Sequence, residues 1–178
     1  MKSQQEEFKK IGIVIYDTDN QEDSDGLKKA VRSVVSAVEG YPQEKIKLIL
    51  CSYSDKTIAD VVTIVNQTKV SIKKTEVVFN LQKKYKNVID YSCFSKLVGA
   101  DFLVRMNHDS VMRKSDLAKI NNLGDETMVV TTENESGVVA FPSAIVSKNY
   151  LEHNEFELMS KSVIKMAKTL GKLEYFGI

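Results

Sequence analysis

The feature that most constrains this chain is a regular alternation between short, largely apolar runs and longer segments whose apolar residues recur at helical spacing. The clearest apolar runs cover residues 11–16, 46–51 and 101–106, and a cluster of polar residues follows each of them. Such runs are typical of central strands in parallel sheets, where helices connect the strands by right-handed crossovers. We therefore expect an α/β fold in which helices flank a mostly parallel central sheet.

Helical spacing is clearest between Leu27 and Val38, where the apolar residues fall on one face. Ser24 or Asp25 is available as the N-cap, and Gly40 marks the end of this helix. Two expected strands, over residues 127–132 and 137–141, are joined by a polar turn. They break the alternation of strand and helix and predict a small antiparallel addition to the sheet. The further expected elements are helices over residues 58–65, 88–98, 115–120 and 159–170, and strands over residues 76–79, 127–132, 137–141 and 173–176.

Length and composition predict one globular domain with a sizeable core. The chain has 178 residues, of which 43% are hydrophobic and 28% are charged. Residues 1–10 are polar and charged, so we expect an N-terminal tail followed by a single domain over residues 11–178. The tail lacks the apolar core of a signal peptide, and no stretch approaches the roughly 20 apolar residues of a membrane span.

The charge balance gives no reason to expect a nucleic-acid partner. The chain carries 25 basic and 24 acidic residues, and a net charge of +1 creates no overall field for nucleic acid or anionic lipid. Cys51 and Cys93 lie in apolar segments without the spacing of a metal or redox motif, which indicates reduced side chains and a cytoplasmic protein. The densest basic run is interpreted as a solvated face rather than a phosphate or RNA surface, and it comprises Lys69, Lys73, Lys74, Lys83, Lys84 and Lys86.

Three polar clusters, at residues 17–20, 52–55 and 107–110, follow three of the expected strands. In open parallel sheets, ligands bind beyond the carboxyl ends of the strands, so we expect these clusters to converge on one crevice. Asp109 follows a buried strand and is well placed to hold a divalent cation against a nucleotide diphosphate. The alternative is that Asp109 only caps the turn that follows it.

These same segments resemble the GT-A fold of the large inverting glycosyltransferase family, in the right order and along nearly the whole chain. The resemblance implies a short, Rossmann-like GT-A domain that binds a nucleotide-sugar with Mn²⁺ or Mg²⁺ and transfers the sugar to an acceptor. Residues 13–15 and 26–34 are similar to the family's opening strand and its "GL..A..SV" first helix, and residues 45–51 and 54–57 are similar to its second strand and "S.D.T" helix start. Residues 95–110 are similar to the "A.G.Y..FLD.DD" segment, which carries the metal-binding DxD motif. Residues 141–151 are similar to the acceptor-side segment, and residues 169–172 to the closing "GyR" strand.

Several positions that carry the family's chemistry are replaced, which makes this an apparently degenerate form. Asn107 stands at the first aspartate of DxD and leaves Asp109 as its only carboxylate, and an amide brings no charge to a metal. His108 is a candidate further ligand for Mn²⁺, although a lone histidine beside an aspartate is more often a surface or turn residue. Cys51 and Ser52 replace the acidic residues that hold base and ribose, and the expected nucleotide contacts are Asp17, Asp19, Asn20, Ser52 and Asn107.

The general base is poorly defined. Inverting transfer needs a carboxylate near the acceptor hydroxyl, and Met159 and Ser160 occupy the place of the family's "ED" motif before the last helix. Glu157 and Glu155 lie just upstream and are the candidate bases. The interpretation favoured by their position is that both glutamates only complement the helix dipole from its first turn.

Two functions stay open at this point. The first is a glycosyltransferase-like domain with a nucleotide-sugar donor and an unknown acceptor. The second is a catalytically inactive GT-A-like module, with a structural or protein-interaction role in a larger assembly such as a viral particle and with a protein as its partner. The chain contains no GxGxxG, GxxxxGK[ST] or GxSxG motif, so dinucleotide-binding, P-loop and α/β-hydrolase chemistry find no support.

Overall fold

The computed structural model of the chain describes residues 7–16, 25–52, 59, 63–64, 75–79, 99–107, 110–124, 127–132, 137–143 and 156–177. Within these residues, seven strands form one sheet in the order β3-β2-β1-β4-β6-β5-β7. Their bounds are β1 Ile11–Tyr16, β2 Ile46–Ser52, β3 Thr75–Phe79, β4 Phe102–Asn107, β5 Val129–Thr131, β6 Val138–Pro142 and β7 Leu173–Tyr175. The expected α/β architecture with a mostly parallel sheet is confirmed.

The centre of the sheet is parallel and buried on both faces. β1 pairs in parallel with β2 on one side and with β4 on the other, and β3 continues the parallel order beyond β2. Ile13, Val14 and Ile15 are all buried although neighbouring side chains of a strand point to opposite faces. This two-sided burial explains why the first strand reads as a continuous apolar run rather than an alternating one.

The expected antiparallel addition is also confirmed. β6 runs antiparallel to both β4 and β5, and β7 then pairs with β5 in parallel. Among the described strands, β6 is therefore the reversed one. β4 begins one residue later than expected, because Asp101 instead exchanges backbone and side-chain hydrogen bonds with Lys10, at 2.8 Å each.

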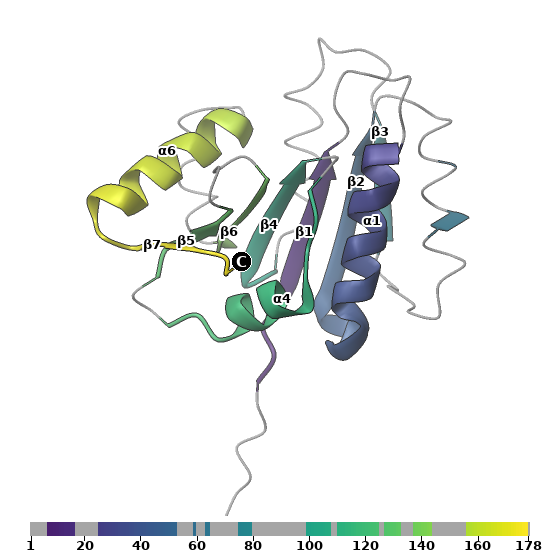
Figure 1. Cartoon of the computed structure of the whole chain (residues 1–178), viewed down its shortest axis with the longest axis horizontal. Helices are drawn as coiled ribbons and strands as arrows, with labels where there is room; N and C mark the ends of the chain where they lie inside the picture. Colours follow the sequence, from purple (N-terminus) through teal and green to yellow (C-terminus); the bar gives the residue numbers. More distant parts are fainter. Residues whose placement is uncertain are drawn as a thin grey trace, which may run out of the picture.

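The structure gives the bounds of three α-helices, and two of them, α1 and α6, contact different strands of the sheet. α1 covers Asp25–Ala37 and contacts β1, β4 and α4, which covers Lys114–Asn121. α6 covers Phe156–Thr169 and contacts β5 and β7, as Figure 1 shows. The short 3-10 helices η1, Val38–Gly40, and η2, Gln43–Lys45, end α1 and lead into β2. Gly171 closes the last helix with φ of 67°, a backbone conformation that favours glycine.

Two expected helices fall largely or wholly on residues that the structure does not describe. Of the helix expected over residues 58–65, residues 59, 63 and 64 are described and are helical. The helix expected over residues 88–98 lies outside the described residues. Residues 7–10 of the expected N-terminal tail are described and bonded to the domain, and the division of the chain at residue 11 stays a prediction.

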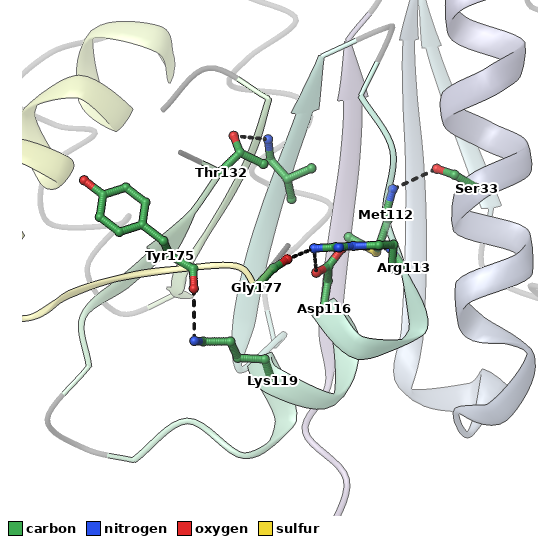
Figure 2. Close-up of polar contacts among 9 residues, drawn as sticks. Ser33, Met112, Arg113, Asp116, Lys119, Thr132, Tyr175 and Gly177 are labelled. Atoms are coloured by element: carbon green, nitrogen blue, oxygen red, sulfur yellow. Dashed lines mark hydrogen bonds and ion pairs between the residues drawn. The ribbon is translucent and has the colours of Figure 1, made fainter. Parts of the chain in front are cut away.

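The last described residues are tied into the fold from two sides. Phe176 is 8% exposed and belongs to the hydrophobic core, and its backbone N–H donates to the Thr131 carbonyl at 3.0 Å. On the side of α4, Lys119 Nζ donates to the Tyr175 carbonyl at 3.0 Å, and the Arg113 guanidinium donates to the Gly177 carbonyl (Figure 2). Residues 173–177 therefore close the outer edge of β5 and hold α4 to it.

Candidate functional site

The candidate site is the edge where β1, β2 and β4 end. Tyr16, the last residue of β1, pairs with Cys51 of β2 on one side and with Asn107 of β4 on the other. The arrowheads of these three strands lie at the same edge in Figure 1. The chain therefore leaves the sheet three times at adjacent positions, which is the arrangement that binds ligands in open parallel sheets.

Two of the predicted site residues are described at this edge. Asn107 is the last residue of β4, its backbone N–H donates to the Gly137 carbonyl at 3.2 Å, and its own carbonyl accepts from the Ser110 N–H at 3.1 Å. Ser52 is the last residue of β2, which lies two strands away across β1. The polar clusters at residues 107–110 and 52–55 therefore both begin at this edge of the sheet.

The side chains of the other predicted site residues are not described by the structure. Glu157 is the second residue of α6, the helix that contacts β5 and β7, and its side chain is not described. Its role as a base, like the alternative of a helix-dipole contact, stays a prediction. Outside the described residues lie Asp17, Asp19, Asn20, His108, Asp109 and Glu155.

The metal site stays a prediction for the same reason. Over the part of the chain that the structure describes, no three His, Cys, Asp or Glu side chains come together as a metal-binding group. The two expected ligands, Asp109 and His108, fall in the gap between the described residues 107 and 110. A carboxylate with an imidazole beside it is a donor set that suits Mn²⁺ and other transition metals.

The segment that follows the candidate ligands is firmly held. Ser110 and Met112 are buried, at 9% and 2% exposure, and the Met112 N–H donates to Ser33 Oγ of α1 at 3.0 Å. The Arg113 N–H then donates to Asp116 Oδ2 at 2.8 Å, in the first turn of α4. Figure 2 shows Met112 facing Ser33, and Arg113 between Asp116 and Gly177. The chain therefore passes from the site to α4 along a fixed path.

Further small polar residues lie beside Asn107: Ser110 belongs to the expected 107–110 cluster, whereas Thr132 was not anticipated as part of the site. Thr132 Oγ1 accepts hydrogen bonds from the N–H groups of Gly137 and Val138, at 3.2 and 3.3 Å, where β6 begins. A Cβ atom at Gly137 would lie 3.0 Å from Thr132 Oγ1 and 3.6 Å from Ser110 Oγ. Ser110 Oγ itself is buried without a hydrogen-bond partner among the described atoms. Ser110 was expected here as the last residue of the 107–110 cluster, and no sequence signal pointed to Thr132.

The opposite edge of the sheet carries a cavity of about 240 Å³, between Tyr41 and α4. The Tyr41 hydroxyl lies 2.7 Å from the Lys9 carbonyl and 3.0 Å from Asn121 Oδ1, so that it ties the segment before β1 to α4. Burial, together with the negative charge of Asp101, raises the pKa of Tyr41 to about 12. Because this cavity lies at the amino ends of the parallel strands, it is separate from the candidate site.

Comparison with known proteins rests on structure. No protein-family model matches the chain, and no curated protein matches it. Among the helices of the described residues, none has the length and apolar character that a membrane crossing requires.

Similar solved structures cover nearly the whole chain at low sequence identity. The mannosyltransferase PcManGT from Pyrobaculum calidifontis, in complex with GDP-Man and Mn²⁺, has a TM-score of 0.68 and 10% identity, over 97% of this chain and 55% of that one. TarS residues 1–349 from S. aureus, in complex with UDP, has a TM-score of 0.63 and 11% identity, over 93% of this chain and 57% of that one. The inositol-1-phosphate CTP transferase from T. maritima has a TM-score of 0.57 and 14% identity, over 96% of this chain and 86% of that one.

These likenesses concern the fold, because every identity is below 15%. The chain spans 55% of the length of the mannosyltransferase and 57% of that of TarS, so it matches little more than half of each. The three proteins have in common a nucleotide in the bound molecule or in the named reaction. The chain has the fold of the GT-A glycosyltransferases.

Proposed function

We propose that this chain is a glycosyltransferase-like domain that binds a nucleotide-sugar at the edge where β1, β2 and β4 end. The observation that carries the proposal is the register that puts Tyr16 between Cys51 and Asn107. The polar clusters that follow β1, β2 and β4 in the sequence therefore begin next to one another at this edge of the sheet. The fold shared with proteins bound to GDP-Man or UDP supports a nucleotide as the ligand of this edge.

The proposed roles follow from the chemistry of the side chains. Asp109, with Asn107 and His108 as further donors, would hold Mn²⁺ or Mg²⁺ against the diphosphate, and the bound cation would neutralise charge on that leaving group. The hydrogen-bonding groups of Asp17, Asp19, Asn20 and Ser52 would contact the base and the ribose. A site with one carboxylate in place of two is expected to bind the cation more weakly, because an amide contributes a dipole and no charge.

For the transfer itself, Glu157 or Glu155 would act as the base. The carboxylate would take the proton of the acceptor hydroxyl as its oxygen attacks the anomeric carbon of the sugar. The bond from that carbon to the diphosphate breaks in the same step, and the nucleoside diphosphate leaves. Glu157 stands in the first turn of α6, the helix that contacts β5 and β7.

A second candidate function is a non-catalytic module that has kept the fold. It is favoured by the amide of Asn107 at the first DxD position and by Met159 and Ser160 at the place of the expected "ED" pair. A fold alone does not imply an activity. In this case a protein, rather than a nucleotide-sugar, would be the partner of the chain.

A thermal-shift titration separates the two functions. The wild-type chain is mixed with UDP, GDP, CDP and dTDP and their sugars, and with CTP, each with and without Mn²⁺ or Mg²⁺. A ligand at about 100 times its Kd stabilises the folded state by about 2.7 kcal/mol. For a domain of this size, that raises the midpoint by roughly 5–10 °C. A metal-dependent shift with one nucleotide supports the proposal, and no shift at millimolar ligand contradicts it in favour of the non-catalytic module.

Two substitutions of Asp109 then test its role. Asp109→Ala removes the charge and any cap, whereas Asp109→Asn keeps the shape and the acceptor oxygen and removes only the charge. If Asp109 holds a metal, both variants lose the nucleotide-induced shift and remain folded. If Asp109 is only a turn cap, Asp109→Ala loses about 1 kcal/mol of stability and Asp109→Asn behaves as the wild type.

A further inference from the structure

The helix α6 and the turn after it carry a concentrated positive charge. This segment, residues 156–172, contains four lysines and one glutamate, which gives it a net charge of +3. Because the whole chain carries +1, all its other residues together carry −2. Figure 1 shows α6 at the end of the sheet where β5 and β7 lie. The near-neutral total therefore conceals a local basic surface at this end of the molecule.

The lysines of this segment lie on its outer side. Three of them recur at intervals of four and three residues, which puts them on one helix face over a length of about 10 Å. They are Lys161, Lys165 and Lys168, and all three are exposed. A different face of α6 packs against the molecule, since Val163 and Ala167 are buried. Lys172, directly after the turn, is exposed as well.

Two exposed apolar side chains lie at the end of this lysine face and just beyond it. Leu170 is 56% exposed and Tyr175 is 44% exposed, and with Val111 they are the exposed large hydrophobic residues of the described part of the chain. Tyr175 points away from the α4 side of the sheet, because side chains alternate along a strand and its neighbour Phe176 packs in the core that α1 and α4 share. Figure 2 shows the Tyr175 ring directed away from Lys119 of α4. Basic and apolar side chains therefore occur together at the C-terminal end of α6.

We propose that α6 and the turn after it dock on an anionic lipid surface, with the lysines beside the headgroups and Leu170 inserted among them. Charge complementarity favours a polyanion, and two further features favour lipid over nucleic acid. The segment contains no arginine, whose planar fork suits phosphate recognition in nucleic acids. An exposed leucine gains free energy when it enters the boundary between headgroups and acyl chains. A tyrosine, with an apolar ring and a polar hydroxyl, suits the same boundary.

The expected strength follows from the charges and from the apolar side chain. Each lysine near an anionic leaflet raises the partition coefficient by about fivefold. Replacement of two lysines by glutamine should therefore lower it by roughly 25-fold. Loss of the leucine side chain from the boundary should lower it by roughly tenfold. The contribution of the lysines is screened by salt over a Debye length of about 8 Å, whereas that of Leu170 is not.

The experiment measures binding of the full chain to vesicles by sedimentation. One set of vesicles is phosphatidylcholine alone, and the other is an equal mixture of phosphatidylcholine and phosphatidylserine. Lys165→Gln/Lys172→Gln removes two charges from the proposed surface, and Leu170→Ser removes its apolar side chain. Lys29→Gln/Arg32→Gln is the matched control, because it removes two exposed charges from α1, a helix that contacts β1, β4 and α4 instead. Binding of oligouridylate to the same variants is measured in parallel. All the replaced residues are exposed, so each variant should keep the unfolding midpoint of the wild type.

Docking on lipid is supported if the wild type binds the mixed vesicles and not phosphatidylcholine alone, and if both α6 variants bind more weakly by the stated factors while the α1 variant does not. It is overturned if the wild type does not bind the mixed vesicles, or if the α1 variant loses as much binding as the α6 lysine variant. Binding of oligouridylate that depends on Lys165 and Lys172, with Leu170→Ser unchanged towards vesicles, overturns it in favour of a nucleic-acid surface. No nucleotide-sugar or metal is added, so the result stands apart from that of the nucleotide titration.

Discussion

Phe176 should contribute far more to stability than its place near the end of the chain suggests. Phe176 is 8% exposed and packs in the core, whereas its neighbour Tyr175 is 44% exposed. Phe→Ala substitutions in cores typically cost about 3–5 kcal/mol. Since β7 has only three residues and can partly collapse into the space, we expect Phe176→Ala to cost about 3 kcal/mol, near the lower end of that range. This corresponds to a fall of roughly 6–12 °C in the midpoint.

Urea unfolding followed by circular dichroism measures this cost, with an unchanged slope as the sign that the folded state stays compact. Tyr175→Ala is the matched control, because it removes an adjacent aromatic ring and leaves the backbone bond from Lys119 in place. We expect the control to cost less than about 1 kcal/mol. The reasoning is refuted if Phe176→Ala lies within about 1 kcal/mol of the wild type, or if Tyr175→Ala costs as much.

Two further predictions concern Tyr41 and Gly137. The folded-state pKa of Tyr41 is about 12 against an ordinary value of 10.0, so its contribution to stability is complete below pH 10 and is lost as the pH rises towards 12. Urea unfolding over this range should show a steeper loss for the wild type than for Tyr41→Phe, and equal slopes would contradict the burial of the phenol. Gly137→Ala should cost about 1–3 kcal/mol, because the new Cβ would meet Thr132 Oγ1 at 3.0 Å. In a double-mutant cycle the cost should shrink in the Thr132→Ala background, and an equal cost in both would exclude this contact as the cause.

Elements with a strong local pattern could be predicted from the sequence. β1 and α1 were expected at nearly their observed bounds, because the burial of a whole strand or of one helix face leaves a regular spacing of apolar residues. The order of the last three strands could not be predicted in the same way. That β6 lies between β4 and β5, and that β7 joins β5 in parallel, depends on pairing between segments far apart in the chain.

For the site, the sequence could predict the edge but not the contacts that shape it. The edge follows from the general behaviour of parallel sheets. Asn107 and Ser52 were expected directly after two strands, and in the structure they are the last residues of β4 and β2. The bond from Met112 to Ser33 was not foreseen. A serine within a helix indicates a side-chain hydrogen bond to nearby backbone, as Ser33 makes to Ala30. Its second partner, 79 residues away, is fixed only when α1 packs beside the end of β4.

The closure of β5 by the last described residues also has a consequence during synthesis. As the chain leaves the ribosome, β1, β2 and β4 are complete long before residues 173–176 are available, and domains tend to form from the N-terminal side. Until those residues emerge, β5 presents an open strand edge, and the pocket in the core that receives Phe176 is unfilled. Open edges are templates for pairing with other chains. The nascent protein therefore passes through a stage in which this side of the sheet is exposed to aggregation, and chaperone binding is expected to concentrate there.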